Sequence, residues 1–411
     1  MKAGTAKRKH GSAGRNDATS RSDCFVELDL TNTGGIKIDL TSKVEALYGK
    51  SIVSLVNKVL GAFEIRHARV AIEDRGAVPF VIAARVEAAA TRVLPGLKRT
   101  YALPNSALPM NASRDRIRRT RLYLPGNEPR FFLNAGLHRP DCVILDLEDS
   151  VVHADKDAAR ILVRNALRQV DFGNAERMVR INQPPLGLQD LQCIIDSEFQ
   201  TILIPKCESA ETVHEIEDEV LKLTSHQKKE RSIFLLPIIE SALGVVRSYE
   251  IATASERVCA IAIGLEDYTA DLGVQRTKNG IESLYARSTI INAAKAAGVQ
   301  ALDSVYSDVA DDEGLRASAL ESKAMGFDGK GCIHPRQIRI IHRAFAPTSE
   351  EIEYAEQVIQ TFREARRAGS GVVALGSTMI DAPVVKRAER MLTLSRMNAK
   401  EEETLGSPQK D

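Results

Sequence analysis

The sequence predicts an α/β protein made of a (β/α)8 barrel preceded by a small α+β domain. From Thr120 onward, short apolar segments alternate with segments of helical spacing over about 220 residues, which is the length that eight strand–helix units require. Polar side chains also follow nearly every predicted strand, as in barrels whose active sites are assembled at the carboxyl ends of the strands. A doubly wound sheet would give a similar alternation, but usually with fewer strands.

The eight predicted barrel strands are short apolar runs that end in polar or turn-forming residues. In chain order they are RLYLPG, DCVILDLED, RMVRIN, TILIPK, IFLLPIIES, VCAIAIGLED, QALDSVYSD and GKGCIHP. The polar residues at their ends are Asp146, Glu148, Asp149, Arg180, Asn182, Lys206, Glu240, Asp267, Asp303, Asp308 and His334. One charged residue at such a position would carry little information, whereas a ring of them indicates an active site.

Changes in composition divide the rest of the chain. The first 22 residues are basic and poor in apolar residues, so we expect a disordered tail over 1–22; a mitochondrial transit peptide would be similar in composition but should be amphipathic. Residues 95–118 are rich in Pro, Asn, Ser and Arg, which cannot build a core, and they predict a linker. The barrel is expected over 119–345, and a helical or lid-like segment over 346–411.

A compact α+β domain is predicted over 23–94, between the tail and the linker. CFVELDL and GIKIDL alternate apolar and polar residues and are separated by TNTGG, which predicts a β-hairpin. From Val44 to Phe63 the apolar residues recur at helical spacing. ARVAIED and PFVIAARVEAA then predict further strand structure and a closing helix.

The bulk composition excludes several classes of partner. The formal net charge is +1 and 44% of the residues are hydrophobic, so no nucleic-acid or membrane partner is implied. No apolar run approaches the roughly 20 residues that span a bilayer. The six cysteines are scattered without a C-x-x-C pair, which favours a reducing compartment and a cytoplasmic location. Gly-rich dinucleotide fingerprints are also missing from the sequence, which disfavours nicotinamide chemistry.

Glu240 and Asp267 predict a metal site, because each directly follows an apolar strand. Two carboxylates from neighbouring strands, without a Cys or His cluster, suit a hard cation. Mg²⁺ usually takes one or two carboxylates and leaves its other positions to substrate and water. The alternative is a pair of salt-bridged acids, but burying two carboxylates without a cation is costly.

Three cationic residues have two interpretations each. Arg180 ends a strand, where its planar fork would clamp a carboxylate or thioester carbonyl, or would form a salt bridge with Asp146 or Glu148. Lys156 and Arg160 lie four residues apart on one helix face, where they would hold phosphates of a nucleotide-bearing cofactor or form a solvated basic face. The residues alone leave both questions open.

The stretch from Arg119 to Arg387 resembles the HpcH/HpaI aldolase and citrate lyase β-subunit family. The matching blocks follow family order: RLYLPGN, VILDLEDSV, VRIN, IESALGV, GLEDYTADLG, GFDGKGCIHPRQI and STMIDAPVV. The resemblance implies a (β/α)8 barrel, usually a trimer or a multiple of it. It places Mg²⁺ at Glu240 and Asp267.

The resemblance also implies roles for individual residues. Arg180 is expected to contact the substrate, and Lys156, Arg160 and the backbone around Ile333 and His334 are expected to contact the CoA-like arm of the substrate. In related citramalyl- and malyl-CoA lyases, an Asp in the block that matches MIDAP enters the neighbouring subunit's active site and acts in catalysis. Here that residue is Asp381.

The small domain resembles the acyl-carrier (γ) subunit of citrate lyase, through GGIKIDL, VEALYGKSI and ARVAIEDRGAVPFVIAARVEAAATR. That carrier holds a CoA-derived prosthetic group on a Ser two positions before an Asp. In this sequence the Asp is Asp23, and Arg21 stands where the Ser should be. Ser20 and Ser22 are the nearby hydroxyls and the possible attachment sites.

The two resemblances together imply a Mg²⁺-dependent carbon–carbon lyase. It would split a citryl thioester, carried on CoA or on an acyl carrier, into oxaloacetate and an acetyl thioester, with an acyltransferase (α) subunit as a possible partner. The alternatives are a citramalyl- or malyl-CoA lyase acting on free CoA thioesters with a structural front domain, and a non-catalytic scaffold subunit of a lyase complex.

Overall fold

The computed structural model describes residues 10–17, 19–96, 99–106, 113–225, 232–367, 373–375 and 378–406. The chain forms two compact units, Met1–Ile338 and Arg339–Asp411. The first unit contains the barrel and the small front domain.

The predicted barrel is confirmed: eight parallel strands close in the order β10-β11-β12-β5-β6-β7-β8-β9. The strands are β5 (Thr120–Pro125), β6 (Cys142–Asp146), β7 (Glu176–Arg180), β8 (Thr201–Ile204), β9 (Phe234–Ile239), β10 (Ala260–Ile263), β11 (Gln300–Asp303) and β12 (Gly329–Cys332). Their residues are almost all buried, because the barrel interior covers one face and the helices cover the other. This double burial explains why they appear in the sequence as continuous apolar runs.

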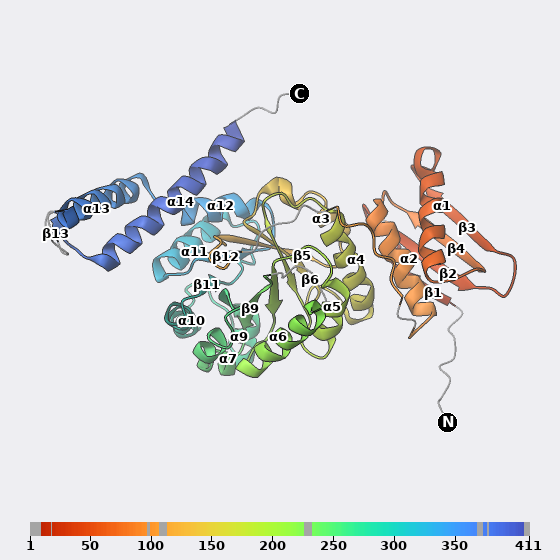
Figure 1. The fold of residues 1–411 in the computed structure, drawn as a ribbon, viewed down its shortest axis with the longest axis horizontal. Helices are drawn as coiled ribbons and strands as arrows, with labels where there is room; N and C mark the ends of the chain where they lie inside the picture. Colours follow the sequence, from red (N-terminus) through yellow and green to blue (C-terminus); the bar gives the residue numbers. More distant parts are fainter. Residues whose placement is uncertain are drawn as a thin grey trace. The chain divides into compact units, whose positions relative to one another are not determined.

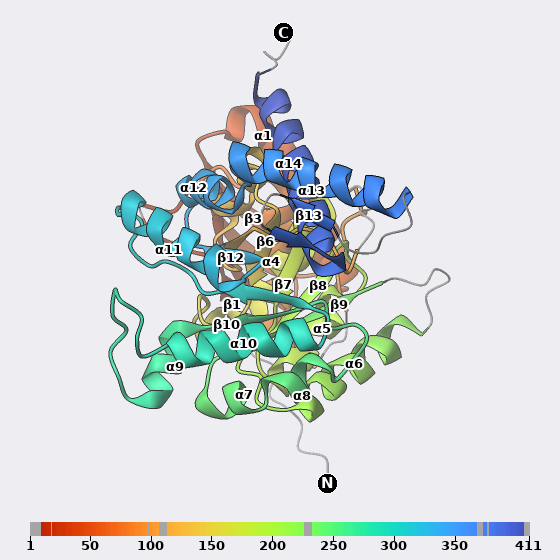
Figure 2. The same cartoon turned by 90° about the vertical axis from the view of Figure 1, so that its left-hand side faces the viewer.

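Helices surround the barrel strands on the outside (Figures 1 and 2). In chain order they are α3 (Pro129–Phe132), η1 (Ala135–His138), η2 (His153–Asp155), α4 (Lys156–Gln169), α5 (Leu186–Ile194), α6 (Ala210–Thr224), α7 (Ala242–Val246), α8 (Ser248–Ala252), α9 (Leu265–Leu272), α10 (Leu284–Ala296) and α11 (Asp312–Met325). Helix α12 (Arg336–Phe345) follows β12, and the boundary between the two units falls within it.

Glycine allows the barrel to close between its last and first strands. β12 pairs with β5, and a Cβ added at Gly329 would lie 1.9 Å from the carbonyl oxygen of Arg118, just before β5. Real Cβ atoms do not approach a backbone oxygen so closely. The close pairing of β12 with β5 therefore depends on Gly329.

Buried charges connect the last two barrel strands to the helix layer. Lys330 of β12 and Arg287 of α10 both donate to Asp303 of β11, at 2.9 and 3.1 Å, and Ser322 of α11 donates to the same carboxylate at 2.5 Å. All four residues are buried. Burial works against the charge of Asp303, but Lys330 and Arg287 outweigh it and hold the pKa of that carboxyl well below its usual range.

The front domain is a four-stranded sheet with two helices on one face (Figure 1). Its elements are β1 (His10–Ala13), β2 (Cys24–Leu30), β3 (Ile36–Ser42), α1 (Glu45–Ala62), β4 (Ala68–Asp74) and α2 (Pro79–Val93). β1 lies in the segment expected to be a disordered tail, and it pairs with β2, so this part of the predicted tail is ordered.

The prediction of a β-hairpin in the front domain was wrong. The strand order is β1-β2-β4-β3, so β4 lies between the two strands that the TNTGG loop connects. The start of β4 occupies the mouth of that loop: Thr31 donates its N–H to the carbonyl of His67, and Ala68 donates its N–H to the carbonyl of Gly35. β2 is antiparallel to β4, whereas β3 is parallel to it.

Helix α2 of the front domain lies between its own sheet and helix α4 of the barrel (Figure 1). Twelve of its fifteen residues are buried, far more than a helix covering one face of a small sheet would bury. Two of these buried residues are charged, Arg85 and Glu87, and both have ionic partners. Contact with the barrel on the second face of α2 explains its burial.

Part of the predicted linker also packs on the barrel. Leu103 is buried, its carbonyl accepts a hydrogen bond from the Arg168 guanidinium at 2.6 Å, and Ser106 donates its N–H to the Arg168 carbonyl at 2.9 Å. Residues 107–112 lie outside the described residues. Residues 99–106 are therefore attached to the barrel surface.

The second unit is built mainly from two long helices, α13 (Ser349–Arg367) and α14 (Ala382–Gly406). The antiparallel strands β13 (Val373–Leu375) and β14 (Thr378–Ile380) connect them. Its small apolar core includes Val358, Ile380 and Ala388. Within the described part of the whole chain, no helix combines the length and apolar character needed to cross a membrane.

Candidate active site

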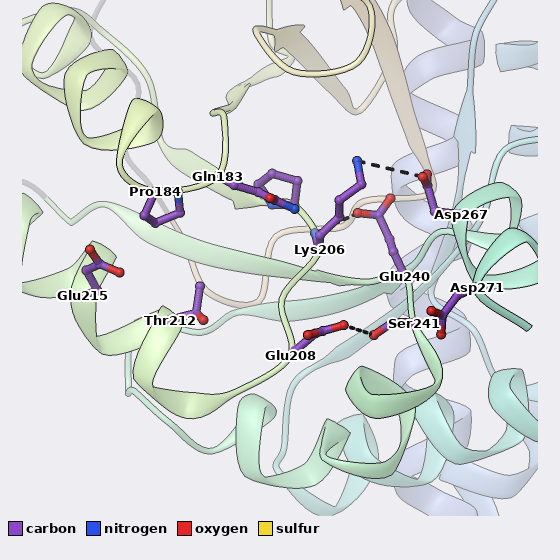
Figure 3. A pocket seen from close by; sticks show the side chains of 11 residues that line it. Gln183, Pro184, Lys206, Glu208, Thr212, Glu215, Glu240, Ser241, Asp267 and Asp271 are labelled. Carbon is purple, nitrogen blue, oxygen red and sulfur yellow. Dashed lines mark hydrogen bonds and ion pairs between the residues drawn. The ribbon is translucent and has the colours of Figure 1, made fainter.

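The predicted metal ligands Glu240 and Asp267 lie together at the carboxyl end of the barrel. Glu240 follows β9, and Asp267 lies in the first turn of α9, directly after β10, which pairs with β9. Figure 3 shows both carboxylates beside Lys206, which follows β8. Three consecutive barrel strands thus contribute one charged group each.

Glu240 is held in a narrow, buried position. Its side chain accepts a hydrogen bond from the Lys206 backbone N–H at 2.8 Å, and it is only 5% exposed. A Cβ at Gly264 would lie 2.5 Å from its carboxylate oxygen, so a larger residue there would force the Glu240 side chain to shift. Burial raises the pKa of Glu240 to about 7, and the charge of Asp267 adds to the rise. A buried carboxylate of this kind is stabilised in its charged form by a nearby cation.

Lys206 lies at the centre of an acidic cluster formed by Glu148, Asp149 and Asp267, a position that was not predicted from the sequence. Its ammonium group lies 2.6 Å from Glu148, 3.2 Å from Asp149 and 3.9 Å from Asp267. Burial alone would lower the pKa of Lys206, but the hydrogen bond and charge of Glu148, with Asp149, outweigh it and raise the pKa. Its backbone φ is +48°, a conformation uncommon for a residue with a side chain. This strain directs the backbone N–H towards Glu240.

Arg180 forms the salt bridge that the sequence left as one of two alternatives. Nε and one terminal nitrogen each donate to Asp146 at 2.7 Å, and the other terminal nitrogen lies 3.2 Å from Glu148. The guanidinium also lies over the Tyr123 ring, 5.4 Å from its centroid. Its planar fork is thus held by Asp146, which fixes its orientation in the site.

Lys156 and Arg160 do not form a solvated basic face, because both have buried partners. The Lys156 ammonium donates to the carbonyls of Leu147 and Glu148 at 2.9 Å each. Arg160 pairs with the buried Asp190 at 2.9 Å. Asp190 also accepts hydrogen bonds from Asn182, which in turn accepts one from Lys156. The two cations therefore belong to one polar network behind the β6 and β7 strand ends.

A cavity of about 520 Å³ opens beside the acidic cluster (Figure 3). Its lining is mostly polar and comes from the loops and helices that follow β7 to β10: Gln183, Pro184, Pro205, Lys206, Glu208, Thr212, Glu215, Glu240, Ser241, Asp267 and Asp271. Ser241 donates to Glu208 at 2.6 Å and caps the first turn of α7. The cavity is large enough for a small polyanionic substrate.

The donor set fits Mg²⁺. Glu240 and Asp267 provide two carboxylates, and no cluster of three or more His, Cys, Asp or Glu side chains able to hold a metal occurs among the described residues. Two carboxylates with open positions suit Mg²⁺, which keeps several water or substrate ligands.

The remaining predicted site residues lie in two places. Ile333 and His334 are exposed directly after β12, at the catalytic end of the barrel. Asp381 lies in the second unit, where its side chain accepts the Val384 N–H at 3.2 Å and caps the start of α14. Asp381 and the metal ligands therefore belong to different compact units of the chain.

The hydroxyls suggested as attachment sites lie in the turn before β2. Ser20 donates to Asp17 at 2.8 Å, and the Ser22 N–H donates to the Arg75 carbonyl at 3.1 Å. The neighbouring Asp23 is buried and pairs with Arg85 through two hydrogen bonds of 2.9 and 2.8 Å. The segment is thus hydrogen-bonded to the rest of the domain.

Comparison with known proteins agrees with this geometry. The family model for HpcH/HpaI aldolase/citrate lyase matches residues 119–335, more than half of the chain, and a model described as malonate decarboxylase delta subunit matches 18–93. The citrate lyase β subunit of Leuconostoc mesenteroides subsp. cremoris is 41% identical over 291 residues, covering 69% of this chain and 95% of the relative.

Two further relatives extend the comparison. The mitochondrial citramalyl-CoA lyase of Homo sapiens is 34% identical over 290 residues, covering 68% of this chain and 85% of the relative. The CitE protein of Mycobacterium tuberculosis, solved with magnesium, acetoacetate and coenzyme A, is 34% identical with a TM-score of 0.56, covering 69% of this chain and 99% of that structure. The chain therefore belongs to the HpcH/HpaI aldolase/citrate lyase family and carries, in front of its barrel, a domain that resembles an acyl-carrier subunit.

Proposed function

We propose that this oxo-acid lyase splits a citryl thioester into oxaloacetate and an acetyl thioester in a Mg²⁺-dependent retro-Claisen reaction. The observation that carries the proposal is the pair of carboxylates, Glu240 and Asp267, beside the cavity at the catalytic end of the barrel. The relative at 41% identity is a citrate lyase β subunit, which supports the citryl group over smaller acyl groups.

Glu240 and Asp267 would hold the metal ion. When bound, the cation supplies Lewis-acid polarisation of the substrate's hydroxyl and adjacent carboxylate. Gly264 and the Lys206 backbone N–H keep the Glu240 carboxylate in place. The ordering of these donors before substrate arrives lowers the reorganisation that the reaction requires.

The chain's own residues act on the acetyl thioester that leaves. The hydroxyl gives its proton to solvent water, the carbon–carbon bond breaks, and its electron pair passes to the acetyl thioester, which leaves as an enolate. Arg180, oriented by Asp146, stabilises negative charge on the thioester oxygen. Asp381 of a neighbouring copy then gives a proton to the enolate carbon, or removes it in the condensing direction.

The arm of the substrate is proposed to lie along the β5, β6 and β12 ends of the barrel. Ile333 and His334 are exposed there, so their backbone is accessible to a CoA arm. Lys156 and Arg160 carry positive charge behind the same rim, although their side chains already have partners. Their proposed effect on the CoA phosphates is therefore electrostatic attraction over several ångströms.

An exposed apolar patch supports assembly into a homotrimer or a multiple of it. Its residues are 41–78% exposed: Leu243, Val246, Tyr249, Leu272, Leu284 and Tyr285. They lie on α7 to α10, and α7 contacts both α9 and α10. Apolar patches of this kind mark interaction sites. Because α9 also carries Asp267, a copy seated on this patch would lie beside the metal ligands, as the proposed role of Asp381 requires.

We propose that the substrate is a thioester of free CoA and is not attached covalently to the front domain. Arg21 replaces the expected attachment residue, and only Ser20 and Ser22 offer hydroxyls near Asp23. Measurement of the intact mass of protein from its native cells tests this: we expect an unmodified chain. A mass increase matching a dephospho-CoA-type group on Ser20 or Ser22 would instead favour a loaded carrier with an acyltransferase partner.

A panel of citryl-, citramalyl- and malyl-CoA, each assayed with Mg²⁺, tests the substrate. We expect the highest kcat/KM for citryl-CoA, with release of oxaloacetate. A higher value for citramalyl-CoA would favour the second candidate function, which the 34% identical citramalyl-CoA lyase supports. A chain that cleaves none of the three and is unaffected by chelation would be a scaffold subunit.

The six unpaired cysteines support the proposed reducing, cytoplasmic location.

A further inference from the structure

Arginine side chains join the front domain to the barrel at several points. Arg164 of α4 pairs with Glu87 of α2 through two hydrogen bonds of 2.9 and 2.7 Å, and both side chains are at most 5% exposed. Arg85 of α2, paired with Asp23, also donates to the Asn127 carbonyl at 3.1 Å, in the loop after β5. Buried pairs of this geometry are orientation-specific, because a guanidinium meets a carboxylate through a planar fork.

Arg92 makes the most extensive of these contacts. Its guanidinium donates twice to Asp157 of α4, at 2.8 and 2.6 Å, and also to the carbonyl of Ala154 at 2.8 Å. Its remaining terminal nitrogen donates to the Ser12 carbonyl of β1 at 2.6 Å. One side chain thus ties the front-domain sheet to the turn in which α4 begins.

That turn leads directly into the active site. The residue before Asp157 in the chain is Lys156. Its ammonium donates hydrogen bonds to the Leu147 and Glu148 carbonyls just after β6. The Glu148 side chain then meets both Arg180, at 3.2 Å, and Lys206, at 2.6 Å. The front domain is therefore joined to the centre of the site by polar contacts on both sides of the peptide bond between Lys156 and Asp157.

We propose that the front domain is a permanently docked brace of the catalytic face, in which Arg92 is a positioning residue that fixes the first turn of α4. A carrier that shuttles an arm between active sites must leave its docking surface. Here that would expose the apolar face of α2 and leave the carboxylate of Glu87 and the guanidinium of Arg164 without each other. The domain has kept a carrier-like fold while serving as part of the barrel.

Cleavage of the connection tests the docking. A protease site inserted between Ser106 and Ser113 in the full-length chain allows the front domain to be cut from the barrel after folding. We expect the two pieces to co-elute in gel filtration at micromolar concentration, because the contacts between α2 and α4 remain. Separation of the pieces on cutting would overturn the proposal.

Arg92→Ala tests the bracing. We expect faster amide hydrogen exchange over residues 153–160. We also expect KM for the acyl-CoA substrate to rise roughly 3- to 30-fold with little change in kcat. Arg92→Lys, which keeps one donor to Asp157, should recover part of both effects. Arg69→Ala, at an exposed position on β4 of the same domain, is the matched control and should change neither.

The kinetic measurement rests on the proposed function, because it needs the acyl-CoA substrate. The hydrogen-exchange measurement does not. Unchanged exchange over residues 153–160 in Arg92→Ala would overturn the bracing even if the chain has a different substrate. If Arg92→Ala does not fold, Asp157→Asn removes the charge from the barrel side with little change in shape. The same exchange increase is then expected, and its absence would equally overturn the proposal.

Discussion

At the scale of single residues, the site depends on where each charge finds its counter-charge. Arg180 and Lys156 were candidates for binding substrate or phosphate, and both have partners within the chain. Glu240 is the reverse case, since its closest partner is a backbone N–H and burial raises its pKa to about 7. Glu240, whose carboxylate has no ion pair among the described residues, is therefore a good candidate for an incoming cation.

Glu240→Gln and Asp267→Asn test the metal site. Each replacement keeps the shape of the side chain but removes the charge that a hard dication needs. We expect loss of Mg²⁺ binding in calorimetry and at least a 100-fold fall in activity, on the order of the effect of removing a key electrostatic group. Unchanged thermal unfolding is the control for the fold. Full activity of the natural chain in excess EDTA would contradict the assignment.

Asp303→Asn tests the buried charges between β11 and the helices. Removing this carboxylate leaves Lys330 and Arg287 without it, so we expect a loss of about 3–5 kcal/mol in the free energy of unfolding at pH 7. Because the folded-state pKa of Asp303 lies below its ordinary value of 3.8, its stabilisation is full above that pH and is lost as the pH falls further.

Urea unfolding of both proteins between pH 7 and pH 3 measures this difference. The gap between the natural chain and Asp303→Asn should stay constant down to about pH 5 and narrow below about pH 4. A gap that widens on acidification would show that Asp303 is not held in its charged form.

At the scale of secondary structure, the barrel could be predicted because its strands are buried on both faces and form continuous apolar runs. The order in which the strands of the front domain pair could not be predicted. The alternation in CFVELDL and GIKIDL shows which residues share a face, but it is the same whichever strand lies alongside. The contacts of His67 and Ala68 with both ends of the TNTGG loop place β4 between them. These are contacts between segments distant in sequence.

The same limit applies to Lys206 within the site. Lys206 was recognised as a strand-end residue, but its φ of +48° becomes known only from the structure, and its contacts with Glu148, Asp149 and Asp267 depend on two other strand ends, those of β6 and β10. A lysine after an apolar strand has no local pattern that distinguishes this role. A non-glycine residue in a left-handed conformation becomes visible only in the structure.

Two glycine substitutions separate packing from backbone flexibility. Gly329→Ala brings a Cβ within 1.9 Å of the Arg118 carbonyl where the barrel closes, so we expect a loss of about 1–3 kcal/mol or more in unfolding free energy. Gly61→Ala, near the end of α1, meets nothing within 4 Å and should add about 0.5–1 kcal/mol. Urea unfolding of each variant measures the difference. Equal effects would contradict the close approach of β12 and β5.

At the scale of the whole molecule, Asp381 is the proposed catalytic group that lies outside the unit containing the barrel strands. It lies in the unit Arg339–Asp411, whereas Glu240 and Asp267 lie in the other unit. The C-terminal block was recognised by its resemblance to a family, and no local pattern in the sequence states which barrel it serves. An assembled oligomer is the natural setting in which to test it.

Complementation tests whether Asp381 acts in a neighbouring copy. Chains with Asp381→Ala and chains with Asp267→Asn are each expected to be inactive. A mixture that exchanges subunits should recover part of the activity, because some sites then combine an intact metal ligand with an intact Asp381. Mixed oligomers that form, as shown by mass spectrometry, yet stay inactive would exclude this arrangement.

The burial of α2 against α4 has a consequence during synthesis of the chain. The ribosome releases the apolar helix Pro79–Val93 first, and the helix Lys156–Gln169 that covers it emerges roughly 70–80 residues later. At about 5–20 residues per second, the apolar face of α2 is left uncovered for on the order of ten seconds. A nascent chain arrested between these two helices should therefore bind ribosome-associated chaperones. A nascent chain that extends past Gln169 and has folded should release them.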